Sequence, residues 1–335
     1  MLAFIARRLG LGVITVIAIS IISFVIIQLP EGDFATGYIE QLLEGDLMTA
    51  PGAATRMEDQ LRREYGLDQP MPVQYFRWVG KMLQGKFGQS LEYRLPVAEV
   101  LGERMLMTVV LATSVVLFTW VLAIPIGIYS AVRQYSVGDY VFTFLGFLGV
   151  ATPDFLLALV LLYASFVYFD FDVGGLFSDE YVGAQWSLGR VVDLGKHLWI
   201  PALVLGTSGT AALIRIMRAN LLDELGRPYV VTARAKGIAE WKLILKYPVR
   251  VALNPLVSTV GYVLPYLISG SIIVSVVLSL YTVGPLLLRA LLVQDMFLAG
   301  TIVMFLGILT VIGTFLSDIL LMFVDPRIKI HADSA

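Results

Sequence analysis

The sequence predicts an all-α integral membrane protein with six transmembrane helices and an external subdomain after the first helix. Hydrophobic residues make up 58% of the 335 residues and charged residues 15%, whereas soluble domains average about 45–50% and about 25%. The mean hydropathy is +0.81. Six separate apolar runs are each about 20 residues long or longer, which is the length that crosses a bilayer as a helix. This composition excludes a soluble globular domain, a coiled coil and a disordered chain.

The predicted spans follow one another along the whole chain. Arg7 and Arg8 precede the first one, as in a signal sequence, but the run is longer than a signal core and no small-residue cleavage site follows, so we expect a retained anchor. A further apolar stretch, 285–293, is too short to cross and is expected to be interfacial or re-entrant. The six spans are Leu9–Leu29, Met105–Ile128, Tyr140–Phe169, His197–Met217, Leu256–Leu280 and Ala299–Val324.

These spans divide the chain into an anchor (1–29), an external subdomain (30–104), a five-helix core (105–330) and a short tail (331–335). The core includes a cytoplasmic loop, 218–250. In the external subdomain, apolar residues recur at near-helical spacing at Val73, Phe76, Val79 and Leu83. This spacing predicts a short amphipathic helix that lies on the membrane surface.

The distribution of basic residues predicts on which side of the membrane each loop lies. Around the 218–250 loop, the segment from Arg215 to Arg250 carries eight Lys or Arg and three Asp or Glu, whereas the short loops on the opposite side carry only Arg190, Lys196 and Arg289. Cytoplasmic loops are the ones enriched in Lys and Arg. With six spans, both termini are therefore expected in the cytoplasm.

The residues needed for most enzyme classes are missing. The chain has no cysteine and two histidines, His197 and His331, which removes disulfides, thiolate metal sites and most zinc chemistry. A net charge of −2 argues against a nucleic-acid binder. No GxxxxGK[ST] loop, HExxH motif or nucleophile elbow is found. We therefore expect no catalytic residue, no bound metal and no cofactor on this chain.

Few ionisable residues lie well inside the spans, which suggests transport driven from outside the chain. Pro153 is expected to kink the third span because it removes a backbone hydrogen bond. The adjacent Asp154 either lines a substrate pathway, where it would pair with a cationic group, or bonds to a neighbouring helix. Asp318, near the end of the sixth span, is expected to cap a helix or pair with a basic residue. Glycines within the spans favour close helix packing over hinges.

The basic loop has the pattern of two short helices. Helix-forming residues begin at Tyr229, and Gly237 stands where a helix C-terminus is often followed by glycine. A second helix is expected over 238–246, with Pro248 ending it. Such a unit either docks as a rigid helix into a groove of a partner protein or lies as a basic helix on anionic lipid.

This loop resembles the "EAA" coupling loop of bacterial ABC importer permeases, and more closely that of the oligopeptide/dipeptide/nickel permease family, first-permease type. That family reads roughly Tyr-x-x-Thr-Ala-Arg-Ala-Lys-Gly at this point. Weaker family-like stretches occur at 7–9, 66–70, 74–75, 85–90, 125–127 and 325–327, in the family's order over almost the whole chain. The matching loop residues are Tyr229, Thr232, Ala233, Arg234, Ala235, Lys236 and Gly237.

The resemblance implies a type I ABC importer permease in the bacterial plasma membrane. Its implied partners are a second homologous permease, two ATPase subunits that bind ATP and Mg²⁺, and an external solute-binding protein that meets loops 30–104 and 170–196. Oligo- or dipeptides lead as substrates, and oligosaccharides, nickel complexes and a stand-alone channel or secondary transporter remain alternatives. The chain departs from the family at Tyr247 (usually His), Val251 (often Asn), Ser275 (commonly Glu) and Tyr281–Gly284 (Pro-Gly-x-Gly).

Overall fold

The structure of the chain is a computed structural model that describes residues 2–28, 34–44, 52–90, 92–169, 174–261, 266, 272–293 and 295–324. Within these ranges the regular elements are helices, apart from an isolated bridge between Gln89 and Pro96. The all-α prediction is therefore confirmed for the described residues.

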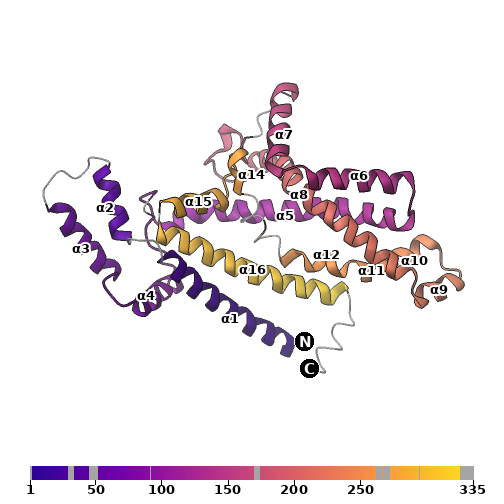
Figure 1. The fold of residues 1–335 in the computed structure, drawn as a ribbon, viewed down its shortest axis with the longest axis horizontal. Coiled ribbons are helices and arrows are strands. Elements are labelled where there is room, and N and C mark those ends of the chain that lie inside the picture. The colour runs from indigo at the N-terminus through magenta and orange to yellow at the C-terminus, as the bar shows by residue number, and fades with distance from the viewer. Residues whose placement is uncertain are drawn as a thin grey trace. The chain divides into compact units, whose positions relative to one another are not determined.

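Four of the described helices are long and apolar enough to cross a membrane. They are α1 (Leu2–Ile27), α5 (Val97–Val132), α8 (Leu188–Leu225) and α16 (Met296–Val324), and Figure 1 shows their course. A shorter pair, α6 (Val137–Ala151) and α7 (Asp154–Phe169), passes the same test together but is bent by 101°. Counting that pair as one span gives five candidates.

The predicted fifth span, 256–280, falls largely outside the described residues, which omit 262–265 and 267–271. Only short helices are described at its two ends, α12 (Asn254–Ser258) and α14 (Ile272–Val277). The count of six spans and the side of each loop therefore stay predictions. The stretch Asp325–Arg327 and the tail also lie outside the described residues.

The chain divides into two compact units. The first unit comprises residues 1–9, 107–281 and 310–335, and the second comprises residues 10–106 and 282–309. The predicted domain boundaries rest on which segments cross the membrane. The division into two compact units does not test them.

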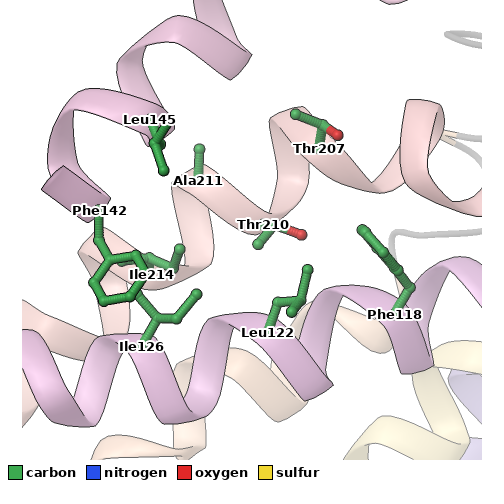
Figure 2. A pocket seen from close by; sticks show the side chains of 10 residues that line it. Phe118, Leu122, Ile126, Phe142, Leu145, Thr207, Thr210, Ala211 and Ile214 are labelled. Atoms are coloured by element: carbon green, nitrogen blue, oxygen red, sulfur yellow. The ribbon is translucent and has the colours of Figure 1, made fainter. Parts of the chain in front are cut away.

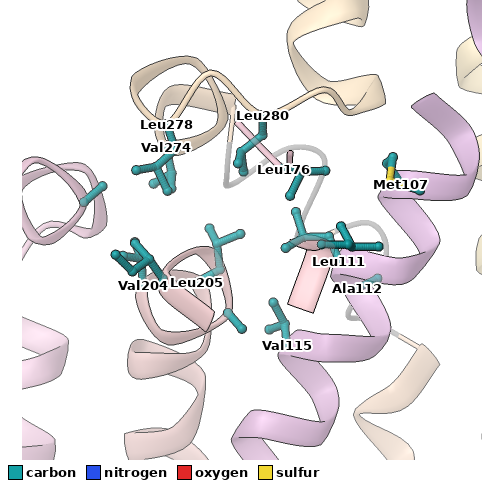
Figure 3. Packing of buried hydrophobic residues seen from close by; sticks show 14 of the residues in the cluster. Met107, Leu111, Ala112, Val115, Leu176, Val204, Leu205, Val274, Leu278 and Leu280 are labelled. Atoms are coloured by element: carbon teal, nitrogen blue, oxygen red, sulfur yellow. The ribbon is translucent and has the colours of Figure 1, made fainter. Parts of the chain in front are cut away.

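Helix α8 is the centre of the first unit, because α6, α7, α11 (Pro248–Ala252) and α12 all pack against it. Two apolar clusters lie along it. Figure 3 shows the first, which brings together Met107 and Leu111 of α5, Leu205 of α8 and Leu278, which follows α14. The second cluster lies toward the C-terminal end of α8 and includes Met217 and Leu221.

Close approach of helices explains several glycines in this unit. A Cβ atom on Gly206 of α8 would lie 2.7 Å from Phe118, and one on Gly149 of α6 would lie 2.7 Å from Thr207 Cγ2. Both distances are too short for any side chain without a shift of the neighbour. The packing interpretation of these glycines is therefore confirmed.

The N-terminal end of α8 is fastened to the segment before it. The carboxylate of Asp193 accepts hydrogen bonds from the backbone N–H and the hydroxyl of Ser178, at 2.8 and 2.7 Å. The guanidinium of Arg190, which is 3% exposed, lies over the rings of Phe177 and Trp186 at 4.5 and 4.6 Å. These contacts hold the 177–187 segment against the first turns of α8.

In the second unit, α2 (Phe34–Glu44) packs against α3 (Ala53–Tyr65), and the aromatic rings of Tyr75 and Trp78 on α4 (Met71–Leu83) contact Phe24 of α1. The hydroxyls of Tyr75 and Ser20 are 2.7 Å apart. Helix α4 is the amphipathic helix that the sequence predicts, and Val73, Phe76 and Leu83 on it are exposed. Its position on a membrane surface stays a prediction.

In the second unit, a buried carboxylate lies between the end of α15 (Val283–Leu292) and the start of α16. Asp295 is completely buried and accepts hydrogen bonds from Ser90 Oγ at 2.6 Å and from the backbone N–H of Leu298 at 3.0 Å. It thus caps α16 and holds the 85–96 loop in place. Helix α15 is the apolar stretch that is too short to span.

Candidate functional site

The basic loop forms two short helices, as its sequence predicts. Helix α9 covers Pro228–Ala235 and α10 covers Glu240–Lys246. Gly237 lies between them with φ +72°, and its N–H donates to the carbonyl of Arg234 at 3.0 Å. The second helix begins at Glu240 rather than Ile238, and Pro248 both follows α10 and starts α11. Figure 1 shows α9 and α10 together at the C-terminal end of α8.

The two helices are anchored through their buried faces. Val230 and Leu243 have no exposed surface, and Ala233 and Ile244 are also buried. They belong to the second apolar cluster, together with Met217, Leu221, Val249, Ala252 and Leu256. Each fully buried aliphatic side chain of this size contributes about 1.5–3 kcal/mol through burial. Helices α9 and α10 are therefore held to α8 by a continuous core.

The family-like residues divide between the two faces of α9. Tyr229 is half-buried and its hydroxyl donates to the carboxylate of Glu224 near the end of α8, whereas Ala233 points into the core. These two residues position the helix. The other members, Thr232, Arg234, Ala235, Lys236 and Gly237, are exposed on the described structure.

An ion pair joins α9 to α10 on the exposed side. The guanidinium of Arg234 donates to both carboxylate oxygens of Glu240, with Nε 3.1 Å from Oε2. These hydrogen bonds hold the pKa of Glu240 below its usual range. The pair therefore stabilises the loop at pH values above the ordinary carboxyl pKa and is lost as the pH falls through the lowered one. The sequence analysis did not single out Glu240, because its spacing of six residues matches no helical pair.

A second ion pair lies at the same end of the unit. Asp139 of α6 is 3% exposed and accepts from Arg218 of α8 at 3.1 and 2.9 Å, and from the backbone N–H of Tyr135 at 3.0 Å. This contact fixes the start of α6 against α8. Its partners are 79 residues apart in sequence, so no local pattern could reveal it.

The predicted kink at Pro153 is a complete break. Helix α6 ends at Ala151, and Asp154 occupies the first turn of α7, which leaves at 101°. The half-buried Asp154 side chain lies near Tyr266, whose hydroxyl is 3.2 Å from Ser208 Oγ. A polar side chain of another segment is thus near the carboxylate, and the role of Asp154 toward a substrate stays a prediction.

A small apolar pocket of about 200 Å³ lies between α5, α6 and α8 (Figure 2). Phe118, Leu122, Phe142 and Leu145 line it, among others. The hydroxyls of its two threonines, Thr207 and Thr210, donate to carbonyls within α8. The pocket therefore presents hydrocarbon and offers little to a polar substrate.

The absence of a metal site and of catalytic residues stays a prediction. Among the described residues, no group of three or more His, Asp or Glu side chains is placed to hold a metal ion. The buried Asp295 and Asp139 are each occupied by the structural contacts given above. Asp318 pairs with Arg8 at 3.1 Å, as predicted for it.

Comparison with known proteins gives two family matches that cover most of the chain. Residues 123–330 match the family described as "Binding-protein-dependent transport system inner membrane component", and residues 1–112 match its N-terminal companion. The chain is 34% identical over 331 residues to "Oligopeptide transport system permease protein AppB" of Bacillus subtilis, covering 98% of this chain and 100% of the relative. It is 30% identical over 345 residues to "Dipeptide transport system permease protein DppB" of Escherichia coli, covering 98% and 99%. It is 31% identical over 294 residues to "Oligopeptide transport system permease protein OppB" of Mycobacterium bovis, covering 86% and 90%.

Proposed function

Because the chain belongs to the family of binding-protein-dependent transport inner membrane components, we propose that it is one permease subunit of an ATP-driven importer in a bacterial inner membrane. It would form half of the translocation pathway. A second homologous permease, two ATPase subunits carrying ATP and Mg²⁺, and an external solute-binding protein would complete the importer.

Oligo- or dipeptides are the proposed substrates. The relatives that match over 98% of this chain include an oligopeptide permease and a dipeptide permease. The departures of this chain from the family at Tyr247 and Ser275 argue against assuming an ordinary dipeptide as the substrate. Ser275 is 2% exposed on α14, so a glutamate there would need a buried partner that a serine does not.

The observation that carries the coupling role is the two-faced build of α9. Its inner face, Val230 and Ala233, is fixed to α8 through the apolar cluster, and its outer face presents Thr232, Ala235 and Lys236 to solvent. A rigid helix with a free face suits docking into a groove of a partner. Closure of the ATPase dimer would move α9, and the shared core would pass that movement to α8.

Transport would then follow as a population shift. The ATPase subunits with and without ATP would contact α9 differently, and this difference would favour one orientation of the spans over the other. No chemical step occurs on this chain in such a scheme. The free energy comes from ATP hydrolysis on the partners.

The absence of native cysteine allows a direct test of this contact. Ala235→Cys places a single thiol on the exposed face of α9, and Lys86→Cys places a matched exposed thiol in the second unit. With both ATPase subunits co-expressed, a short thiol cross-linker should join position 235 to an ATPase subunit and leave position 86 unlinked. Absence of the cross-link at 235 in an intact, purified importer would refute the coupling role.

The ion pair between Arg234 and Glu240 allows a second test, which measures function and not contact. Arg234→Glu puts a carboxylate against Glu240 and should lower substrate-stimulated ATP hydrolysis, because the ion pair that joins α9 to α10 on their exposed side is lost. The exchange Arg234→Glu with Glu240→Arg restores a pair of opposite sense. Recovery in the exchange would show that the pair acts by holding the loop, and continued loss would show that the charge of Arg234 itself meets the partner. Unchanged hydrolysis in both variants would contradict the proposal.

A further inference from the structure

A second apolar groove lies beside the coupling helices. It has a volume of about 470 Å³ and runs between the last turns of α5 and helix α10. From α5 it is lined by Pro125, Ile128 and Val132, and from α10 by Trp241 and Leu245. Trp241 is 63% exposed and Leu245 52%. Large apolar side chains exposed along one groove need an apolar occupant.

The depth of the groove points to lipid. The predicted apolar run of α5 ends at Ile128, so Pro125 and Ile128 lie where acyl chains end. Arg133, which also lines the groove, is five residues further on, or about 7.5 Å at 1.5 Å per residue. That places its guanidinium at the level of lipid headgroups. An indole such as that of Trp241 is also typical of this level.

The charges beside the groove favour an anionic headgroup. Arg133 lines its edge, and Lys242 extends from α10 with Nζ 5.3 Å from the centre of the Trp241 ring. The nearby acids are engaged elsewhere, since Asp139 pairs with Arg218 and Glu240 pairs with Arg234. Within the described part of the chain, no ion pair is found for Arg133 or Lys242.

We propose that this groove is a binding site for an anionic phospholipid, with an acyl chain against Pro125, Ile128 and Leu245 and the phosphate held by Arg133 and Lys242. The site uses the face of α10 beside α5, whereas the proposed ATPase contact uses the outer face of α9. The sequence of the basic loop allowed two roles, docking to a protein and contact with lipid. In this proposal α9 docks to the ATPase and α10 contacts the lipid. The lipid would brace α10 against α5.

Bromine-labelled lipids test the proposal on the whole chain alone. The chain is reconstituted in phosphatidylcholine vesicles with rising fractions of brominated phosphatidylglycerol or brominated phosphatidylcholine, and tryptophan fluorescence is recorded. The contribution of Trp241 is the difference from Trp241→Phe. It should be quenched at a several-fold lower fraction of the anionic lipid than of the neutral one. Arg133→Gln or Lys242→Gln should each reduce this preference by about fivefold, the effect of one basic residue at an anionic surface.

Lys86→Gln, an exposed cation of the second unit, is the matched control and should leave the preference unchanged. Equal quenching by the two brominated lipids would overturn the proposal, as would an unaltered preference in both glutamine variants. Loss of the Trp241 quenching when the ATPase subunits are added would assign the groove to a protein interface instead. Because the first measurements need no ATPase, their result is independent of the proposed transport function.

Discussion

The turn at Gly237 offers a graded test of how the coupling loop is built. Its φ of +72° lies in the left-handed region, which side chains other than glycine adopt only with strain. A Cβ atom added there would meet no heavy atom within 4 Å. The effect of Gly237→Ala is therefore purely conformational, without a steric clash that would obscure it.

The expected size of the effect follows from the backbone alone. A left-handed conformation disfavours an alanine by roughly 1–2 kcal/mol, which changes the population of the native turn by about 5- to 30-fold. Gly237→Asn should weaken it less, because asparagine tolerates this region. Gly237→Pro is the most severe change, because the proline ring fixes φ near −65° and the N–H that donates to the Arg234 carbonyl is lost.

Binding of the purified ATPase subunits to the permease in lipid nanodiscs measures this population, because the apparent dissociation constant rises as the competent fraction falls. The expected order of affinity is glycine, asparagine, alanine, proline, with the protein still present in the membrane fraction for all four. An alanine variant that binds as tightly as the glycine parent, or an asparagine variant weaker than alanine, would refute the reasoning. Unchanged coupling in the proline variant would show that the loop contacts no ATPase.

Three further predictions concern other regions. Asp154→Asn should slow uptake of cationic substrates more than that of neutral ones in proteoliposomes, and equal uptake of both would favour a structural role. Asp139→Ala should destabilise the first unit by about 1.5–3 kcal/mol, because it removes the charged hydrogen-bond partner of the partly buried Arg218. A lowered thermal unfolding midpoint in detergent measures this, and an unchanged midpoint contradicts it. A thiol at Gly52 should be labelled by an impermeant reagent from outside the cell while a reporter fused after Ala335 reports from the cytoplasm, and inaccessibility of position 52 from outside would refute the topology.

Features set by neighbouring residues are the ones that could be predicted from the sequence. The long apolar helices follow from composition, and the turn at Gly237 follows from a helix-forming run that ends in glycine. The break at Pro153 was predicted in place but as a kink within one span. The size of the 101° bend depends on how α7 packs against α8 and α14, and that packing has no local signature.

The ion pairs of the site show the same limit. Arg218 and Asp139 stand 79 residues apart, and only the packing of α6 on α8 brings them together. The family resemblance identified Tyr229 and Ala233 together with the exposed residues of α9. It could not show that these two face inward and act by positioning the helix, because their burial depends on the apolar cluster formed with α8 and α10.

The length of α8, which continues through the interior Pro201, has a mechanical consequence. Its 38 residues form a rod of about 57 Å at 1.5 Å per residue. One end is held by Asp193 and by Arg190, whose guanidinium lies against Phe177 and Trp186, and the other carries α9 and α10 on a common core. Tilting such a lever by roughly 5° about one end displaces the other by about 5 Å. A small rotation of this one helix would therefore move its far end by about one helical turn, so α8 can transmit a displacement between the segment at its N-terminal end and helices α9 and α10.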